Sequence, residues 1–184
     1  MREIEVKLKV NNFEELETRL KEKSCVLSEP ISQRDVIYSL GGSTKGLANS
    51  KEGDVFIRIR YLKNTAQLNL KKQRSGEMDN IEYETEVVDP KATHLILTTL
   101  GWSPVLEVKK IRRKGKLGEC EICLDQVEQL GTFVELERLV DDDVSPEEVK
   151  EELFTNLDLL GLSRSDEETK GYDIQIYQRS NSNG

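Results

Sequence analysis

The sequence predicts an α+β fold, a closed eight-stranded antiparallel β-barrel with helices packed on the outside. Three observations lead to this prediction. Polar and apolar residues alternate with a period of two over much of the chain, as is typical of strands. Most alternating segments are joined by short turns, which favours antiparallel neighbours. A few segments with helical spacing lie between them and need an apolar surface to cover.

The first predicted strand, residues 2–10, shows the alternation most clearly. Glu3 and Glu5 share one face, whereas Ile4 and Val6 share the other. Eight strands of this kind, joined mostly by short turns, can form a sheet that closes on itself. The other seven are predicted over residues 33–40, 54–62, 65–73, 80–88, 104–112, 116–125 and 131–139.

Helix-start signals accompany two of the four predicted helices. Asp89 before Pro90 is typical of an N-cap followed by proline at the first helical position. Ser145 with Glu148 has the spacing of a capping box. The helices are predicted over residues 12–23, 90–100, 146–160 and 168–178. We expect one domain over residues 1–179 and a disordered tail over 180–184.

Composition limits the classes of function. The 184 residues fit one domain, and the formal net charge of -8 argues against a nucleic-acid partner. No apolar run approaches the ~20 residues that span a bilayer, so no membrane partner is expected. The three cysteines are an odd number without the spacing of a disulfide framework. We therefore expect a cytoplasmic protein.

The charged faces of the strands are sorted by sign. Glu82, Glu84 and Glu86 share one face of the fifth predicted strand, and Arg58 and Arg60 share one face of the third. Such faces are usually solvated outer surfaces. Adjacent like charges on one strand face nevertheless repel unless opposite charges or metals lie nearby. The set as a whole therefore favours acidic and basic strands that face one another.

Amphipathic helices on the outside of the sheet would turn the apolar strand faces outward and the charged faces inward. A polar interior is costly unless water, ions or a charged ligand fill it. The natural occupant is a polyanion held by Lys and Arg, with divalent cations held by Glu and Asp. The charge pattern thus points to a phosphate-chain substrate.

The ordered series of charged residues resembles the CYTH superfamily, the triphosphate tunnel metalloenzymes, and especially its class IV adenylyl cyclase-like branch. Glu3, Glu5 and Lys7 form an ExExK pattern similar to that family's signature. Asp35 and Tyr38 resemble a strand of the cyclase branch. The remaining matches, in chain order, are Arg58 and Arg60, Lys71, Glu82, Glu84 and Glu86, Lys110 and Arg112, Asp125, and Glu135 and Glu137.

The resemblance covers residues 3–137 and implies a role for each matching residue. It implies a triphosphate bound by Lys7, Arg58, Arg60, Lys71, Lys110 and Arg112. It implies Mg²⁺ or Mn²⁺ held by Glu3, Glu5, Glu84, Glu135 and Glu137, with Glu82 and Glu86 as further candidates and one of the three neighbouring glutamates at the tunnel mouth. Catalytic roles fall to Asp125, Lys7, Arg58 and Arg60, with Asp125 or a hydroxide on the metal deprotonating the nucleophile. Strict alternation equally allows Lys109 and Arg113, rather than Lys110 and Arg112, to face inward.

The resemblance implies an adenylyl cyclase that converts ATP to cyclic AMP and pyrophosphate. One alternative is a triphosphatase acting on thiamine triphosphate or inorganic tripolyphosphate. Another is a non-catalytic polyphosphate- or nucleotide-binding module, which the filled acidic positions disfavour. A lipocalin-like barrel with an apolar interior would instead expose Glu3 and Arg58. The expected partner is a small triphosphate, and a homodimer is one option for the oligomeric state.

Overall fold

The strand alternation produces a barrel whose apolar residues face outward. The computed structural model describes residues 2–44 and 51–182. Strand β1 (Arg2–Val10) buries Ile4, Val6 and Leu8 completely or almost completely on its outer face. These side chains pack with helices α1 (Glu14–Glu22) and α4 (Pro146–Asp158) in one hydrophobic core. The period of two therefore marks a buried outer face of the barrel.

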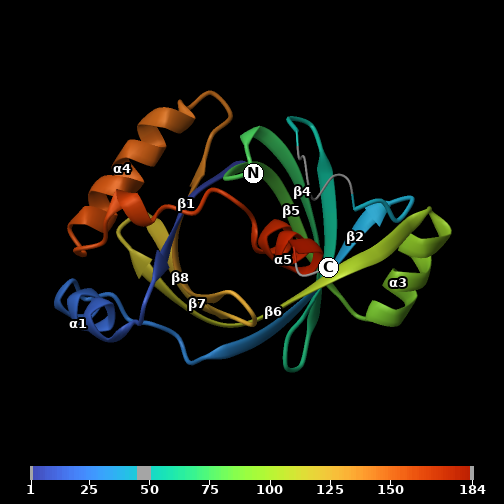
Figure 1. Ribbon diagram of the computed structural model, residues 1–184, viewed down its shortest axis with the longest axis horizontal. Coiled ribbons are helices and arrows are strands. Elements are labelled where there is room, and N and C mark those ends of the chain that lie inside the picture. Colours follow the sequence, from blue (N-terminus) through green and yellow to red (C-terminus); the bar gives the residue numbers. More distant parts are fainter. Residues whose placement is uncertain (1, 45–50, 183–184) are drawn as a thin grey trace.

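In the described part of the chain, eight antiparallel strands close into a barrel in the order β1-β5-β4-β3-β2-β6-β7-β8 (Figure 1). The strands after β1 are β2 (Ile31–Leu40), β3 (Val55–Tyr61), β4 (Ala66–Gly76), β5 (Asp79–Val87), β6 (Trp102–Leu117), β7 (Cys120–Val127) and β8 (Gly131–Val140). The remaining helices are α3 (Pro90–Thr99), the short 3₁₀ helix η1 (Arg164–Asp166) and α5 (Tyr172–Ser182). None of the helices in the described ranges is long and apolar enough to cross a membrane.

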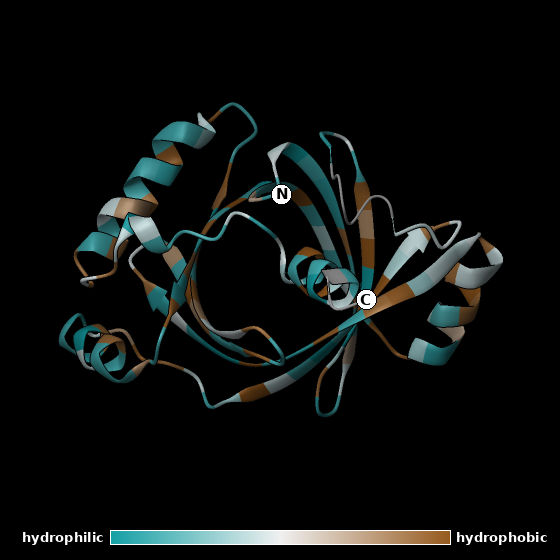
Figure 2. Cartoon of the chain, viewed as in Figure 1, coloured by the Kyte–Doolittle hydropathy of each residue, from teal (hydrophilic) through white to brown (hydrophobic). Residues whose placement is uncertain are grey.

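Two outer cores hold the helices on the barrel. α1 and α4 cover the outward residues of β1, β7 and β8, where Ile122 and Leu136 are fully buried. α3 contributes Leu97 to a second core with Val36 and Ile59 from β2 and β3. Figure 2 shows the hydrophilic and hydrophobic residues interspersed along the strands. The predicted outside position of the helices is therefore confirmed for α1, α3 and α4.

Helix α5 differs, because it packs against residues on the inner face of the barrel. Its Tyr172 and Ile176 share a core with Ile37, Val108 and Phe133 from β2, β6 and β8. In Figure 1 this helix lies within the outline of the ring. The inward residues of these strands are apolar at this end and charged further along. α5 therefore occupies one end of the barrel interior.

Most predicted element boundaries agree with the structure, and two need correction. β6 runs through the segment predicted as a turn and continues to Leu117. Gly115 lies inside this strand. A Cβ at this position would lie 2.7 Å from the Cys25 sulfur, so a larger residue would clash there. At the C-terminus, α5 continues to Ser182, so residues 180–182 are helical although a disordered tail was expected. The rest of that tail lies outside the described residues.

A buried ion pair fastens the seam between β1 and β5. Only Arg2 to Ile4 of β1 are in register with β5. The Arg2 guanidinium binds both carboxylate oxygens of Asp79 at 2.8 and 3.0 Å and also donates to the carbonyls of Asp142 and Val144. Asp79 is fully buried. This pair closes the ring where the strand pairing is shortest.

We expect Asp79→Ala to lower the free energy of unfolding by about 3–5 kcal/mol, because it leaves the buried Arg2 guanidinium without its carboxylate partner. Urea denaturation followed by circular dichroism measures the change. Glu107→Ala is the matched control, since it breaks the exposed Arg34–Glu107 pair, which has side chains 41% and 46% accessible. That pair should contribute about 0–1 kcal/mol. Equal losses in the two variants would contradict the role of the seam.

Candidate active site

The inward-facing charged residues line a cavity of about 440 Å³ inside the barrel. This volume falls within the ~300–1,000 Å³ typical of small-molecule sites. Glu3 and Arg58 both line it, so the alternative barrel with an apolar interior is wrong. The basic residues that line it include every predicted phosphate ligand: Lys7, Arg58, Arg60, Lys71, Lys110 and Arg112.

On one wall, two cations of β6 are held by a carboxylate of β7. Lys110 Nζ lies 2.9 Å from Asp125, and Arg112 Nε lies 2.6 Å from the same carboxylate. Arg112 also pairs with Glu135 of β8. Asp125 is fully buried; burial alone would raise its pKa, but Lys110 and Arg112 hold that pKa below the usual range. Asp125 therefore fixes these cations from behind.

The structure also decides which of the two alternative basic pairs on β6 faces inward. Lys110 and Arg112 line the cavity. Arg113 lies on the other face, where it donates to Glu17 of α1 at 2.9 Å and to the Ser28 carbonyl at 3.0 Å. Lys109 is exposed. The pair on the inner face is therefore Lys110 and Arg112.

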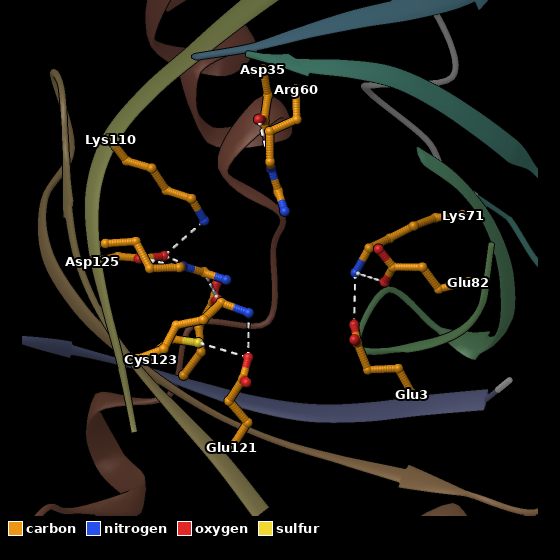
Figure 3. A network of polar contacts seen from close by, with 12 residues as sticks. Glu3, Asp35, Arg60, Lys71, Glu82, Lys110, Glu121, Cys123 and Asp125 are labelled. Atoms are coloured by element: carbon orange, nitrogen blue, oxygen red, sulfur yellow. Dashed lines mark hydrogen bonds and ion pairs between the residues drawn. The ribbon is translucent and has the colours of Figure 1, made fainter. Parts of the chain in front are cut away.

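A second carboxylate that holds two cations joins β2 and β3. Arg60 binds both oxygens of Asp35 at 2.9 Å, and Arg58 lies 3.5 Å from the same carboxylate. Burial opposes the charged form of Asp35, yet Arg58 and Arg60 hold its pKa well below the usual range. Asp35 comes from β2, and Figure 3 shows it meeting Arg60 at the edge of the shared cavity.

The opposite wall carries Lys71 of β4 between two carboxylates. Its Nζ lies 2.8 Å from Glu3 and 3.0 Å from Glu82 (Figure 3). Glu82 also pairs with Arg58 at 3.3 Å and accepts a hydrogen bond from Asn69. Although burial opposes it, Lys71 and Arg58 hold the pKa of Glu82 below its usual range. Glu82 thus holds the basic side chains of Lys71 and Arg58 in place.

The acidic residues gather most closely at Glu3, Glu5 and Glu137. Each offers a carboxylate oxygen, and these oxygens all lie within 4.8 Å of one another. Burial and the neighbouring Glu135 raise the pKa of Glu5 to about 7. Burial and Glu3 likewise raise the pKa of Glu137 well above its usual range. Converging carboxylates with raised pKa values indicate a place that is short of positive charge.

The other predicted metal ligands do not belong to this acidic trio. Glu135 contacts Arg112, as described above. Glu84 lines the cavity, but its carboxylate is 39% accessible and accepts a hydrogen bond from Gln67. Glu86 is exposed further along β5. The three glutamates of β5 therefore sit at different depths, with Glu82 the innermost.

Several residues of the cavity carried no signal in the charge pattern. Tyr172 and Asp173 come from α5, far from the matching strands in the sequence. Phe56, Met78 and Ile174 add apolar surface to the cavity. Alternation along β3 could have placed Phe56 inward beside Arg58. The residues of α5 could not be placed in this way, because its docking inside the barrel depends on tertiary packing.

Comparison with known proteins agrees with this architecture. A curated relative from Methanocaldococcus jannaschii, described as a "putative adenylate cyclase", is 26% identical over 94% of this chain and 97% of its own length. A solved structure from Pyrococcus horikoshii is 28% identical, with a TM-score of 0.78 over 94% of this chain and 98% of that chain. A Hippeastrum protein, described as a putative adenylyl cyclase with a dominant triphosphatase activity, is 18% identical, with a TM-score of 0.62 over 98% and 95% of the two chains.

The remaining comparison concerns the domain itself. The model of the CYTH domain matches residues 1–172. That range contains all eight strands of the described barrel and every residue of the ExExK pattern. The chain therefore belongs to the CYTH family.

Proposed function

We propose that this protein is a metal-dependent enzyme that acts on a triphosphate inside its barrel. The observation that carries the proposal is the convergence of six basic side chains and an acidic trio on one cavity. A triphosphate carries close to four negative charges, and charge-assisted hydrogen bonds from Lys and Arg are the strongest means of binding it. The six are Lys7, Arg58, Arg60, Lys71, Lys110 and Arg112.

The acidic trio fits Mg²⁺ or Mn²⁺. Its donors are all carboxylate oxygens, which hard divalent cations prefer, and they lie close enough together to share one ion. Glu3, Glu5 and Glu137 would hold the metal, and Glu135 and Glu84 are the next predicted carboxylates. A bound divalent cation would offset charge on phosphate oxygens as the bond to phosphorus breaks.

The protein's own residues would position and stabilise the phosphate chain. Phosphoryl transfer depends mainly on positioning and on electrostatic stabilisation of the developing charge. Arg58, Arg60 and Lys71 would hold the chain from β3 and β4, and Lys110 and Arg112 would hold it from β6. Asp125 binds Lys110 and Arg112 and has a lowered pKa. We therefore assign Asp125 to holding these cations instead of accepting a proton from the nucleophile.

We propose cyclisation of ATP as the first candidate reaction. The 3′ oxygen would attack the α-phosphorus and the bond from that phosphorus to the bridging oxygen would break. The products would be cyclic AMP and pyrophosphate, and the 3′ hydroxyl proton would pass to solvent. The Methanocaldococcus jannaschii relative is described as a putative adenylate cyclase. The apolar side chains of Phe56, Met78 and Ile174 beside the charged groups also favour an organic triphosphate over an inorganic one.

Hydrolysis of a triphosphate is the second candidate, because the same cations and carboxylates would serve attack by water. The triphosphatase activity described for the Hippeastrum protein supports it. A product assay separates the two reactions. ATP, thiamine triphosphate and tripolyphosphate are each incubated with Mg²⁺ or Mn²⁺, and cyclic AMP, pyrophosphate and orthophosphate are measured. Cyclic AMP with equimolar pyrophosphate supports cyclisation, whereas orthophosphate without cyclic AMP overturns it in favour of hydrolysis.

We expect Arg58→Ala to lower kcat/KM for the active triphosphate by at least ~10²-fold, because Arg58 would stabilise charge on the phosphate chain. Steady-state kinetics at saturating metal measures the effect. Arg34→Ala is the matched control, since Arg34 lies on the neighbouring strand with its side chain 41% accessible. This control should keep wild-type activity. Wild-type turnover in Arg58→Ala would contradict the proposed site.

We expect Mn²⁺ affinity to rise between pH 6 and pH 8. The raised pKa of Glu5, about 7, means that this carboxyl is largely protonated at pH 6 and must lose its proton to bind a metal. Isothermal titration calorimetry in buffers of different ionisation enthalpy measures both the affinity and the protons released. Glu5→Gln should weaken binding and reduce its pH dependence. Constant affinity across this range, with no proton release, would argue against the acidic trio as the metal site.

A further inference from the structure

The first turn of α5 reaches the phosphate-binding residues. Gly171, Tyr172 and Asp173 line the cavity, although the CYTH model ends at residue 172. Tyr172 is 8% accessible. Its ring packs edge-on against Phe133 of β8, with 5.1 Å between ring centroids and 63° between ring planes. The packing of α5 therefore fixes the ring inside the barrel.

Two ammonium groups lie against this ring. Lys7 Nζ is 4.6 Å from the centroid, and Lys110 Nζ is 5.0 Å from it. Both distances are within the ~6 Å over which an aromatic ring attracts a cation. The two lysines come from β1 and β6, and the ring from α5. A single side chain thus contacts two predicted phosphate ligands from different strands.

The ring matters most to Lys7. Among the described residues, Arg58, Arg60, Lys71, Lys110 and Arg112 each have a carboxylate within 4.0 Å, whereas Lys7 has none. Lys7 is nevertheless 1% accessible. A buried ammonium needs compensation for lost hydration. The Tyr172 ring supplies part of that compensation by direct contact, and the carboxylates of Glu5, Glu135 and Asp173 add attraction at longer range.

Tyr172 adds no charge of its own. Burial, together with the neighbouring carboxylates of Glu135 and Asp125, raises the pKa of Tyr172 well above its usual value. The phenol therefore stays neutral throughout the working range of pH. A carboxylate in this place would compete with an anionic substrate for the two cations. A neutral ring can hold the cations without such competition.

We propose that Tyr172 is a positioning residue that holds Lys7 and Lys110 against its ring so that both ammonium groups meet the phosphate chain. The proposal rests on the proposed function for its consequence in catalysis. The contact between the ring and the lysines exists in the protein alone. The contact between the ring and the lysines can therefore be tested separately from its consequence in catalysis.

Lys110 provides a readout that does not need substrate. Burial and the adjacent Arg112 lower its pKa, while Asp125 and Glu135 oppose the shift. Arg60 of β3 and Asp35 of β2 also act on this charge. Because an aromatic face favours the protonated ammonium, loss of the ring should lower the pKa of Lys110 further.

The test compares Tyr172→Leu with Tyr172→Phe in the full chain without metal or substrate. Lysine labelled with ¹³C at Cε is followed by NMR across a pH titration, and Lys110→Arg assigns the Lys110 signal. We expect Tyr172→Leu to lower the pKa of Lys110 by about 0.5–1.5 units and Tyr172→Phe to leave it close to wild type. Tyr61→Leu is the matched control, because Tyr61 stacks on Arg34, at 4.1 Å, away from the cavity. It should leave the pKa of Lys110 unchanged.

Tyr172→Leu could disturb the docking of α5, so a second substitution preserves the shape of the ring. Incorporation of 3,4,5-trifluorophenylalanine at position 172 weakens the attraction of the ring for cations while keeping its packing. We expect this residue to lower the pKa of Lys110 relative to Tyr172→Phe. Equal pKa values for the two rings would overturn the proposal, even if Tyr172→Leu does not fold.

The kinetic arm uses the triphosphate identified in the product assay. Tyr172→Leu should lower kcat/KM about tenfold and move the basic limb of its pH profile to lower pH, and Tyr172→Phe should restore both. Activity unchanged in a folded Tyr172→Leu protein would overturn the positioning role. If no triphosphate is turned over by the wild type, the proposed function fails, whereas the NMR result still decides whether the ring holds Lys110.

Discussion

Opposite charges inside the barrel must neutralise one another for this fold to exist. Helices bury outward residues of β1, β7 and β8 and of β2 and β3, so the charged residues of these strands face the interior. Asp35 holds Arg60, Glu82 holds Lys71, and Asp125 holds Arg112. Each pair joins two strands of the ring. An unpaired charge in such a place would cost several kcal/mol, so these pairs maintain the interior and aim its cations.

The neutralisation is uneven along the cavity. Carboxylates outnumber basic side chains among the described residues that line it. Glu3, Glu5 and Glu137 lie together, and the pKa values of Glu5 and Glu137 are raised. Arg58, Arg60, Lys71, Lys110 and Arg112 are already paired with carboxylates, so an added polyanion would compete with those partners. On the proposed function, a divalent cation that arrives with the polyanion would relieve both imbalances.

Local alternation, taken together with the sorted charges and the amphipathic helices, predicted the barrel and its inner face. In β1, the residues Glu3, Glu5 and Lys7 face the cavity while Ile4 and Val6 are buried outside, as the period of two indicates. Alternation does not say how deep in the cavity a residue of the strand lies, or which residue it contacts across the barrel. That limit explains why Glu84 and Glu86 could not be separated from Glu82.

Long-range packing decided the features that the charge pattern missed. Arg112 lies opposite Asp125 because β6 and β7 pair in a particular register. The side-chain contacts could not be read from the spacing of these residues. The place of Tyr172 depends on a helix at the far end of the chain, whose Tyr172 and Ile176 pack with Phe133 inside the barrel. Strand periodicity contains no information about such a helix, and the match to the family ends where the helix begins.

The distribution of pKa values limits where a proton can move within the cavity. Asp35, Glu82 and Asp125 are paired with cations that hold their pKa values low, so they act as fixed negative charges near neutral pH. The protein's only histidine, His94, lies on α3 and contacts the Tyr38 hydroxyl at 2.8 Å on the outer side of the barrel. Glu5, with a pKa of about 7, is the carboxyl of the acidic trio that titrates near neutral pH, and there a metal would compete with the proton. This arrangement favours catalysis by fixed charges and a bound cation over general acid–base chemistry by a histidine.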